Sequence, residues 1–259
     1  MTDNPEKNWF GNRAVSPDEK TGLVRGVFDS VAERYDLMND LMSLGVHRKW
    51  KADFIRMIRP QPGLNYLDVA GGTGDIAFKI KKKMDEKTAQ NPNAPASNIT
   101  LLDLTYDMLS VGRDRALDKG YGTDFNWICG NAEMLPLEDN SQDIYTISFG
   151  LRNVTHIDTA LSEAHRVLKP GGRFYCMEFS HVQVPVVDKL YNFYSDALIP
   201  RLGEKVAQDR DSYQYLVESI RKFPTQSQLK KRMNQVGFKH TKVHDFTFGV
   251  VAVHSGIKA

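Results

Sequence analysis

The stretch LDVAGGTGD, residues 67–75, decides the fold class of this chain. Its apolar beginning is typical of a buried strand, and the glycine-rich loop that follows opens a predicted helix. A strand that passes through a tight glycine turn into a helix is a unit of a doubly wound α/β fold, where such turns bind ligands. Read from Gly72, the loop also matches a nucleotide fingerprint, because Gly74 and Ala77 follow at the right spacing. The match leaves open whether the loop holds a pyrophosphate or a ligand without phosphates.

Segments of strand length alternate with helical segments on both sides of this stretch. The predicted strands cover residues 64–70, 99–104, 125–129, 144–149 and 173–179, and the predicted helices cover 74–83, 106–119, 159–168 and 226–235. Such alternation predicts an α/β fold with a mostly parallel sheet and helices on both faces. Two more strands, 242–246 and 250–254, have a connection too short for a crossover, so they must pair as an antiparallel C-terminal hairpin. The expected sheet therefore has seven strands.

We expect the whole chain to form a single domain, with further segments before, between and after the predicted strands and helices. Polar residues dominate the N-terminus, apolar stripes at helical spacing follow it, and a second helical region lies between the fifth strand and the C-terminal helix. Residues 85–97 are expected to form a surface loop, and 169–172 a tight turn that stops a helix. The expected divisions of the domain 1–259 are a flexible arm at 1–20, N-terminal helices covering the active site at 22–58, and a core at 64–259 with a helical insertion at about 182–222.

The composition is typical of a soluble globular protein without a strong charge bias. The 259 residues are 41% hydrophobic and 25% charged, and the net charge is +2. This charge indicates no nucleic-acid partner, but it permits a modest attraction to an anionic membrane surface. The two cysteines form no CxxC pair and the histidines show no metal-ligand spacing, so we expect no metal and a reducing compartment. The N-terminus has no apolar signal sequence, and no run of about 18 apolar residues could span a bilayer.

Three polar positions at predicted strand ends distinguish between the two kinds of ligand. Asp68 lies just before the glycines, where a carboxylate would repel a pyrophosphate but suits a cation such as S-adenosylmethionine. Asp103 ends the second strand, where an acidic side chain can accept both ribose hydroxyls. Asn131 follows the third strand and can bind an adenine edge. Each aspartate alone could be a solvated strand-end carboxylate, but together the three positions favour S-adenosylmethionine over a dinucleotide.

Several longer stretches resemble the ubiquinone/menaquinone-biosynthesis C-methyltransferases. The most specific are FGLRNVTH at 149–156 and SYQYLVESIR at 212–221, whereas RVLKPGG at 166–172 occurs in many class I methyltransferases. The resemblance also includes FDSVAERYDLMNDLMSLGVHRKWK at 28–51, LDVAGGTGDIAF at 67–78 and GNAEMLPL at 130–137, and it extends from about Phe28 to Lys258. One departure is Asp103-Leu104-Thr105, where the family usually has Asp-Ile-Asn. It affects any contact made by that asparagine, but not the contact expected of Asp103.

The resemblance implies a Rossmann-like class I methyltransferase fold, S-adenosylmethionine as the cofactor, and methyl transfer to a ring carbon. The implied acceptor is a polyprenyl benzoquinol of the 2-polyprenyl-6-methoxy-1,4-benzoquinol type, with demethylmenaquinol as a second acceptor. Two other functions stay open: methyl transfer to another phenolic or lipid acceptor, and a non-catalytic scaffold that binds the cofactor. The candidate cofactor-binding residues, from the loop and from the family's motifs, are Asp68, Gly71, Gly72, Thr73, Gly74, Asp103, Asn131, Ala132 and Ser148.

Candidate catalytic residues follow the fourth strand. A ring carbon attacks a methyl group well only if an adjacent hydroxyl loses its proton, so the site needs a proton acceptor or a group that stabilises the phenolate. Arg152 and Asn153 are candidate catalytic residues, and Arg152 is our candidate for stabilising the phenolate, because arginine stays protonated. His156 is a candidate base, or else it caps the next helix. The candidate quinol contacts, each of which could instead be a core residue, are Tyr35, Met38, Tyr194 and Tyr213.

The implied substrate also determines the expected partners. A polyprenylated quinol dissolves in the membrane, so we expect peripheral association with a membrane surface, or delivery of the quinol by other quinone-biosynthesis enzymes. The behaviour of related methyltransferases leads us to expect a homodimer. The implied location is the cytoplasm with peripheral association to the inner membrane in a bacterium, or the matrix face of the inner membrane in a mitochondrion.

Overall fold

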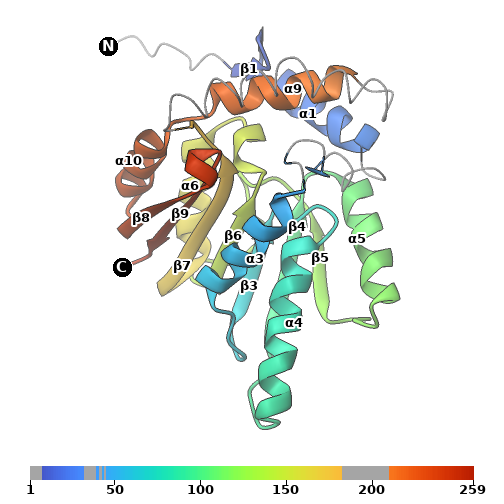
Figure 1. Cartoon of the computed structure of the whole chain (residues 1–259). Coiled ribbons are helices and arrows are strands. Elements are labelled where there is room, and N and C mark those ends of the chain that lie inside the picture. The colour runs from blue at the N-terminus through green and yellow to red at the C-terminus, as the bar shows by residue number, and fades with distance from the viewer. Residues whose placement is uncertain (1–7, 32–38, 41–42, 44, 183–209) are drawn as a thin grey trace.

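The structure, a computed structural model, describes residues 8–31, 39–40, 43, 45–182 and 210–259. Within these residues, seven strands form one sheet in the order β5-β4-β3-β6-β7-β9-β8, with helices on both faces (Figure 1). The strands are β3 Asn65–Val69, β4 Asn98–Asp103, β5 Phe125–Cys129, β6 Gln142–Ser148, β7 Leu168–Phe179, β8 Lys239–Phe246 and β9 Val251–Ile257.

The strand pairing confirms the expected α/β fold and its C-terminal hairpin. Strands β3 to β7 pair in parallel, whereas β9 is antiparallel to both β7 and β8. After β5 the chain returns to the centre of the sheet and places β6 beside β3, on the side opposite β4. The strand order reverses at this point, and ligands of open α/β sheets bind beyond the carboxyl ends of the strands at such a reversal. The glycine loop follows β3, so it lies at this crevice.

Alternate strand residues bury their side chains on opposite faces of the sheet. On β3, Tyr66 belongs to one core cluster, while Leu67 and Val69 belong to the other. The first cluster takes side chains from helices α3 (His47–Ile58), α4 (Asp75–Gln90) and α5 (Tyr106–Asp118). The second takes side chains from α6 (Ile157–Val167) and α10 (Gln226–Val236).

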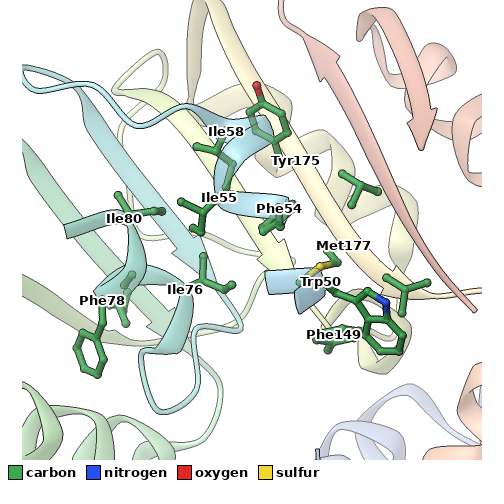
Figure 2. Packing of buried hydrophobic residues seen from close by; sticks show 14 of the residues in the cluster. Trp50, Phe54, Ile55, Ile58, Ile76, Phe78, Ile80, Phe149, Tyr175 and Met177 are labelled. Carbon is green, nitrogen blue, oxygen red and sulfur yellow. The ribbon is translucent and has the colours of Figure 1, made fainter. Parts of the chain in front are cut away.

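Helix α3 illustrates how the sequence determines this packing. Its buried residues Trp50, Phe54 and Ile58 recur every four positions, which is the spacing of one helix face. Figure 2 shows this face beside Tyr175 and Met177 of β7, in the same cluster. Burial of an apolar side chain of this size stabilises the fold by about 2 kcal/mol. The face holds α3 on the sheet and leaves most of its charged residues directed outward, except Lys51, which is buried and pairs with Asp75 at 2.7 Å.

Helix α4 is longer than the sequence predicts, so the expected loop at 85–97 is wrong in its first part. The helix continues to Gln90, and irregular chain covers only 91–97. The residues up to Gln90 are mostly good helix formers, and no proline or glycine interrupts them before Pro92. Met84 is buried on the sheet, and Lys87 Nζ donates to the carbonyl of Pro60 at 2.7 Å, so the helix also has tertiary support.

The expected tight turn at 169–172 is likewise wrong, because these residues lie inside β7. Its pairing with β6 shifts register between Leu168 and Arg173, as in a β-bulge. Gly171, with a φ of 79°, donates its amide to the carbonyl of Lys258 at 2.7 Å. This pairing with the C-terminal segment satisfies backbone groups that a turn would leave to solvent, and local sequence patterns do not reveal it.

Residues 8–20, expected to belong to a flexible arm, form regular structure instead. Strands β1 (Asn8–Phe10) and β2 (Arg13–Val15) make a small hairpin, and α1 (Pro17–Val31) begins directly after it. The physical reason is contact with α9 (Arg210–Lys222), the described part of the expected helical insertion. Phe10 stacks on Tyr215 with ring centroids 4.2 Å apart. Figure 1 shows β1, α1 and α9 together above the carboxyl ends of the strands.

Candidate functional site

A pocket lies where the chain leaves β3, β4, β5 and β6. It has about 720 Å³ of empty space, part of it open to solvent. Five of the candidate residues line it: Gly72, Asp103, Asn131, Ala132 and Asn153. Helix α1 contributes Thr21, Val24 and Phe28 to the wall. The other wall residues come mainly from the strand ends and are largely apolar, as in pockets that bind small molecules.

The glycine loop needs its glycines for its own shape. Gly72 has a φ of 53°, and its amide donates to Asp103 Oδ2 at 2.9 Å. Gly74 has a φ of 86° at the N-terminus of α4, and a Cβ there would come within 2.7 Å of the Phe78 ring. Gly71 and Gly74 close the turn through a backbone hydrogen bond, although neither lines the pocket. The loop thus turns sharply and brings its backbone against the pocket.

Asp103, at the end of β4, is held in place by the loops around it. Its Oδ2 accepts from the Gly72 amide, and its Oδ1 accepts from the Thr105 amide at 2.9 Å. Burial raises the pKa of Asp103 to about 6, although these amides favour its charged form. A carboxylate has about four lone-pair sites, so each oxygen can accept a further bond from the pocket side. Asp103 is therefore a fixed, mainly ionised acceptor at neutral pH.

Asp68 lies beneath the loop rather than on the pocket wall. It is only 1% exposed, and Thr146 Oγ1 donates to its Oδ1 at 2.7 Å. Its Oδ2 is buried with no hydrogen-bond partner among the described residues. Burial, together with a smaller effect of the nearby Asp103, raises the pKa of Asp68 to about 7. Any attraction of Asp68 for a cation therefore acts through the loop.

Hydrogen bonds join the segment after β5 to the segment after β6. Asn131 Oδ1 accepts from the Glu133 amide at 2.9 Å, and Glu133 Oε1 accepts from the Thr155 amide at 2.9 Å. Glu133 Oε2 lies 2.7 Å from His156 Nδ1, and the His156 side chain is about half exposed. His156 occupies the N-cap position of α6 but makes no capping hydrogen bond. It lies beside the pocket, and Glu133 lies on the pocket wall.

Two more candidate cofactor contacts are close to the pocket but do not line it. Thr73 is buried, and its hydroxyl accepts from Arg115 at 3.0 Å. Ser148 ends β6, and its Oγ is buried without a partner among the described residues. Thr73 directly follows the wall residue Gly72 in the chain, and Ser148 directly precedes the wall residue Phe149.

Arg152 is buried in an ion pair that the sequence did not predict. It lies in the 3-10 helix η2 (Leu151–Asn153), and its Nη1 donates to Glu178 Oε1 at 2.7 Å and to the carbonyl of Phe149 at 2.6 Å. Burial raises the pKa of Glu178, and the Arg152 charge opposes that rise. Arg152 lines a second pocket, which shares Val154 and Thr155 with the first.

The neighbouring Asn153 faces the first pocket and is held by α9. Tyr215 donates its hydroxyl to Asn153 Oδ1 at 3.0 Å, and burial raises the pKa of Tyr215. Tyr213, one of the candidate quinol contacts, is fully buried in α9 and lines neither pocket. The candidates Tyr35, Met38 and Tyr194 lie outside the described residues.

Some site residues could have been found from the sequence. Glu178 is the only acidic residue in the segment that forms β7, and a lone acid in an apolar strand indicates a buried partner. Tyr215 belongs to the specific stretch SYQYLVESIR, but nothing in the sequence connects it with Asn153. The wall residues Thr21, Val24 and Phe28 read as ordinary helix positions.

In the described part of the chain, no three His, Cys, Asp or Glu side chains gather where they could hold a metal ion. None of its helices is long and apolar enough to span a membrane.

Comparison with known proteins gives strong sequence matches. The model of the ubiE/COQ5 methyltransferase family matches residues 14–258. The ubiquinone/menaquinone biosynthesis C-methyltransferase UbiE of Brucella abortus is 52% identical, with 96% of this chain and 90% of that protein covered. The mitochondrial 2-methoxy-6-polyprenyl-1,4-benzoquinol methylase of Pongo abelii is 48% identical, with 96% and 84% covered.

Solved structures match in fold at low sequence identity. A SAM dependent methyltransferase from Aquifex aeolicus has a TM-score of 0.55 at 13% identity, with 95% of this chain and 100% of that chain covered. Phosphoethanolamine N-methyltransferase 2 of Haemonchus contortus, solved with S-adenosyl-L-methionine, has a TM-score of 0.56 at 15% identity, with 81% and 52% covered. These likenesses agree with the strand order described above.

Proposed function

Because this chain belongs to the ubiE/COQ5 methyltransferase family, we propose that it methylates a ring carbon of a polyprenylated benzoquinol, with S-adenosylmethionine as the methyl donor. The acceptor is a 2-methoxy-6-polyprenyl-1,4-benzoquinol, which is named in the mitochondrial relative. The bacterial relative is also named for menaquinone biosynthesis, so demethylmenaquinol is the second candidate acceptor.

The charge of the pocket wall carries the cofactor proposal. Its described residues include two acids, Asp103 and Glu133, and neither a lysine nor an arginine. The amide of Gly72, which a dinucleotide site would direct at a phosphate, already donates to Asp103. The charged side chains of the described wall would repel a pyrophosphate, whereas they attract a sulfonium and an ammonium. These residues fit S-adenosylmethionine, with Asp103 accepting the ribose hydroxyls and Asn131 and Ala132 beside the adenine.

The protein's own residues prepare the acceptor. When bound, S-adenosylmethionine supplies an electrophilic methyl group; the chain must orient the quinol, exclude water and promote loss of a ring-hydroxyl proton. We assign stabilisation of the quinolate to Arg152, which Glu178 holds beside the second pocket, and this pocket shares Val154 and Thr155 with the first. His156 is assigned as the proton acceptor at its Nε2, because Glu133 holds its Nδ1.

The remaining parts of the proposal concern the cell. We infer that the substrate is reached at a membrane surface by peripheral association, and that other quinone-biosynthesis enzymes and a second copy of this chain are partners. The location is the cytoplasmic side of the inner membrane in a bacterium or its matrix side in a mitochondrion, in line with the two kinds of relative.

A methylation assay tests the proposal. The full chain is incubated with S-adenosylmethionine and either a demethyl-benzoquinol or a demethyl-naphthoquinol, and the product mass is measured. A gain of one methyl group on the benzoquinol supports the benzoquinol as the acceptor. A gain on the naphthoquinol alone supports demethylmenaquinol instead. Calorimetry in the same preparation compares S-adenosylmethionine with NADH. Cofactor binding without methylation of either quinol would favour another phenolic or lipid acceptor, or a scaffold.

A further inference from the structure

A basic groove lies between helices α3 and α4 and shares no residue with the pocket. We define the basic groove by its seven basic residues: Arg48, Arg56, Arg59, Lys79, Lys82, Lys83 and Lys87. On α4 the lysines fall at helical spacing, so they form one stripe along the helix. On α3, Arg48 and Arg56 form a second stripe on its exposed side, and Arg59 continues it at the C-cap. The two stripes face each other across the groove, and Figure 1 shows the two helices neighbouring each other.

The positive charge of the groove is unusual for this chain. One acidic residue, Glu86, lines the groove beside the seven basic ones. Asp40, Asp53 and Asp75 also pair with groove residues. After all four carboxylates are counted, three positive charges are left over, which exceeds the net charge of +2 for the whole chain. The rest of the chain is therefore negative on balance, and an anionic surface would attract this face and repel the remainder.

The groove is also apolar between its charges. Ala52, Ile55 and Pro60 line it together with the hydrocarbon stems of the lysines. Such a surface lets ammonium groups reach lipid phosphates while the stems contact the upper acyl region. An acidic protein would need complementary side chains at fixed positions, whereas a bilayer presents anionic headgroups everywhere. The groove therefore fits a lipid surface better than a protein partner.

The position of the groove connects it with the proposed reaction. Helix α4 starts at the glycine loop, and Lys79, one turn into the helix, pairs with its first residue, Asp75, at 2.8 Å. We propose that the basic groove is the surface by which the chain docks on an anionic lipid bilayer, beside the site that uses a membrane-dissolved quinol. This inference rests on the proposed function for its choice of partner, while the groove itself is independent of it.

The test is flotation of the full chain with vesicles of phosphatidylcholine, with or without phosphatidylglycerol. We expect binding only with the anionic lipid, and a loss of about tenfold or more in the double variant Lys82→Glu and Lys83→Glu, because each basic residue near an anionic surface contributes measurably to binding. The matched control is Lys231→Glu with Lys239→Glu, two exposed lysines on α10 and β8 with the same charge change. The unfolding midpoint of each variant shows whether it is folded.

The flotation results decide whether the chain docks on the bilayer through the basic groove. Loss of flotation in the groove variant, but not in the control, supports docking through the groove. Equal loss in both variants, or no binding of the unaltered chain to anionic vesicles, overturns it. Binding to poly-glutamate without binding to vesicles assigns the groove to an acidic protein and also overturns it. Methylation of a short-tailed, water-soluble quinol is measured alongside: activity without flotation refutes only the docking, and flotation without activity on any quinol refutes only the proposed function.

Discussion

Asp103 is the residue on which we expect cofactor binding to depend most. Its pKa of about 6 means that the carboxylate is charged above this pH and loses acceptor capacity below it. We expect the affinity for S-adenosylmethionine to fall as the pH is lowered through about 6. Asp103→Asn should bind about tenfold more weakly at pH 8, because a hydrogen bond to a charged group contributes roughly 1.5–3 kcal/mol. Calorimetry at pH 5.5 and 8 measures both effects; equal affinity of the two proteins at pH 8 would contradict the ribose contact.

Asp68 should make the stability of the cofactor-free chain depend on pH. Its folded pKa of about 7 lies above the value of about 3.9 expected when unfolded. Between these values the folded state binds more protons, so the free energy of unfolding should decrease as the pH rises from about 4 to about 7. The decrease from this group amounts to as much as about 4 kcal/mol, and Asp68→Asn should remove it. Urea unfolding of both proteins at pH 5 and pH 8 tests this; a difference between them that does not change with pH would contradict it.

Glu178 should matter to stability as well as to turnover. Glu178→Gln leaves the Arg152 guanidinium buried without its counter-charge, and we expect the free energy of unfolding to fall by about 3 kcal/mol. Turnover should fall too, since Arg152 is no longer held in place, while the affinity for the cofactor changes little. The control is Glu86→Gln, whose pair with Lys83 is exposed and should contribute nothing measurable. Denaturation and kinetics on both variants separate the two effects; a Glu178 variant as stable as the control would contradict the assignment.

At the scale of elements, periodicity predicted the helices and strands well and their ends poorly. The strands β3, β4 and β5 lie close to their predicted ranges, because buried parallel strands are short apolar runs between loops. The misjudged regions, the end of α4 and the start of β7, are decided by contacts with distant parts of the chain. The small N-terminal hairpin has the same origin, since Phe10 stacks on Tyr215. Local patterns carry no information about such partners.

Helix α9 is predicted to act on the reaction through Tyr215. Its hydroxyl fixes Asn153 on the pocket wall, so Tyr215 is a positioning residue. Tyr215→Phe should lower kcat about tenfold, because small displacements of site residues are costly, and should destabilise the fold by about 1 kcal/mol. The dissociation constant for S-adenosylmethionine should change much less. Tyr106→Phe, an exposed tyrosine on α5, serves as the control. A purely structural role would lower stability and leave kcat of the folded enzyme unchanged.

At the scale of the whole molecule, the sheet topology explains which site residues could be predicted. Gly72, Asp103 and Asn131 each lie at or just after the carboxyl end of a parallel strand, so their meeting at one edge follows from the fold class alone. The pairs Arg152 with Glu178 and Glu133 with His156 depend on side-chain directions, which the fold class does not specify. Asp68 shows the limit of reasoning from position: it has the expected charge-bearing group but lies beneath the loop.

Because the pocket is assembled from α1 and four strand ends, only the folded chain can bind its cofactor there. Binding must then stabilise the whole fold by mass action. At a concentration of S-adenosylmethionine one hundred times its dissociation constant, the free energy of unfolding should rise by about 2.7 kcal/mol. NADH at the same concentration should leave it unchanged, since the acidic wall repels a pyrophosphate, and Asp103→Asn should show a smaller rise with S-adenosylmethionine. Chemical unfolding with each ligand measures these shifts, and stabilisation by NADH equal to that by S-adenosylmethionine would reverse the assignment of the pocket.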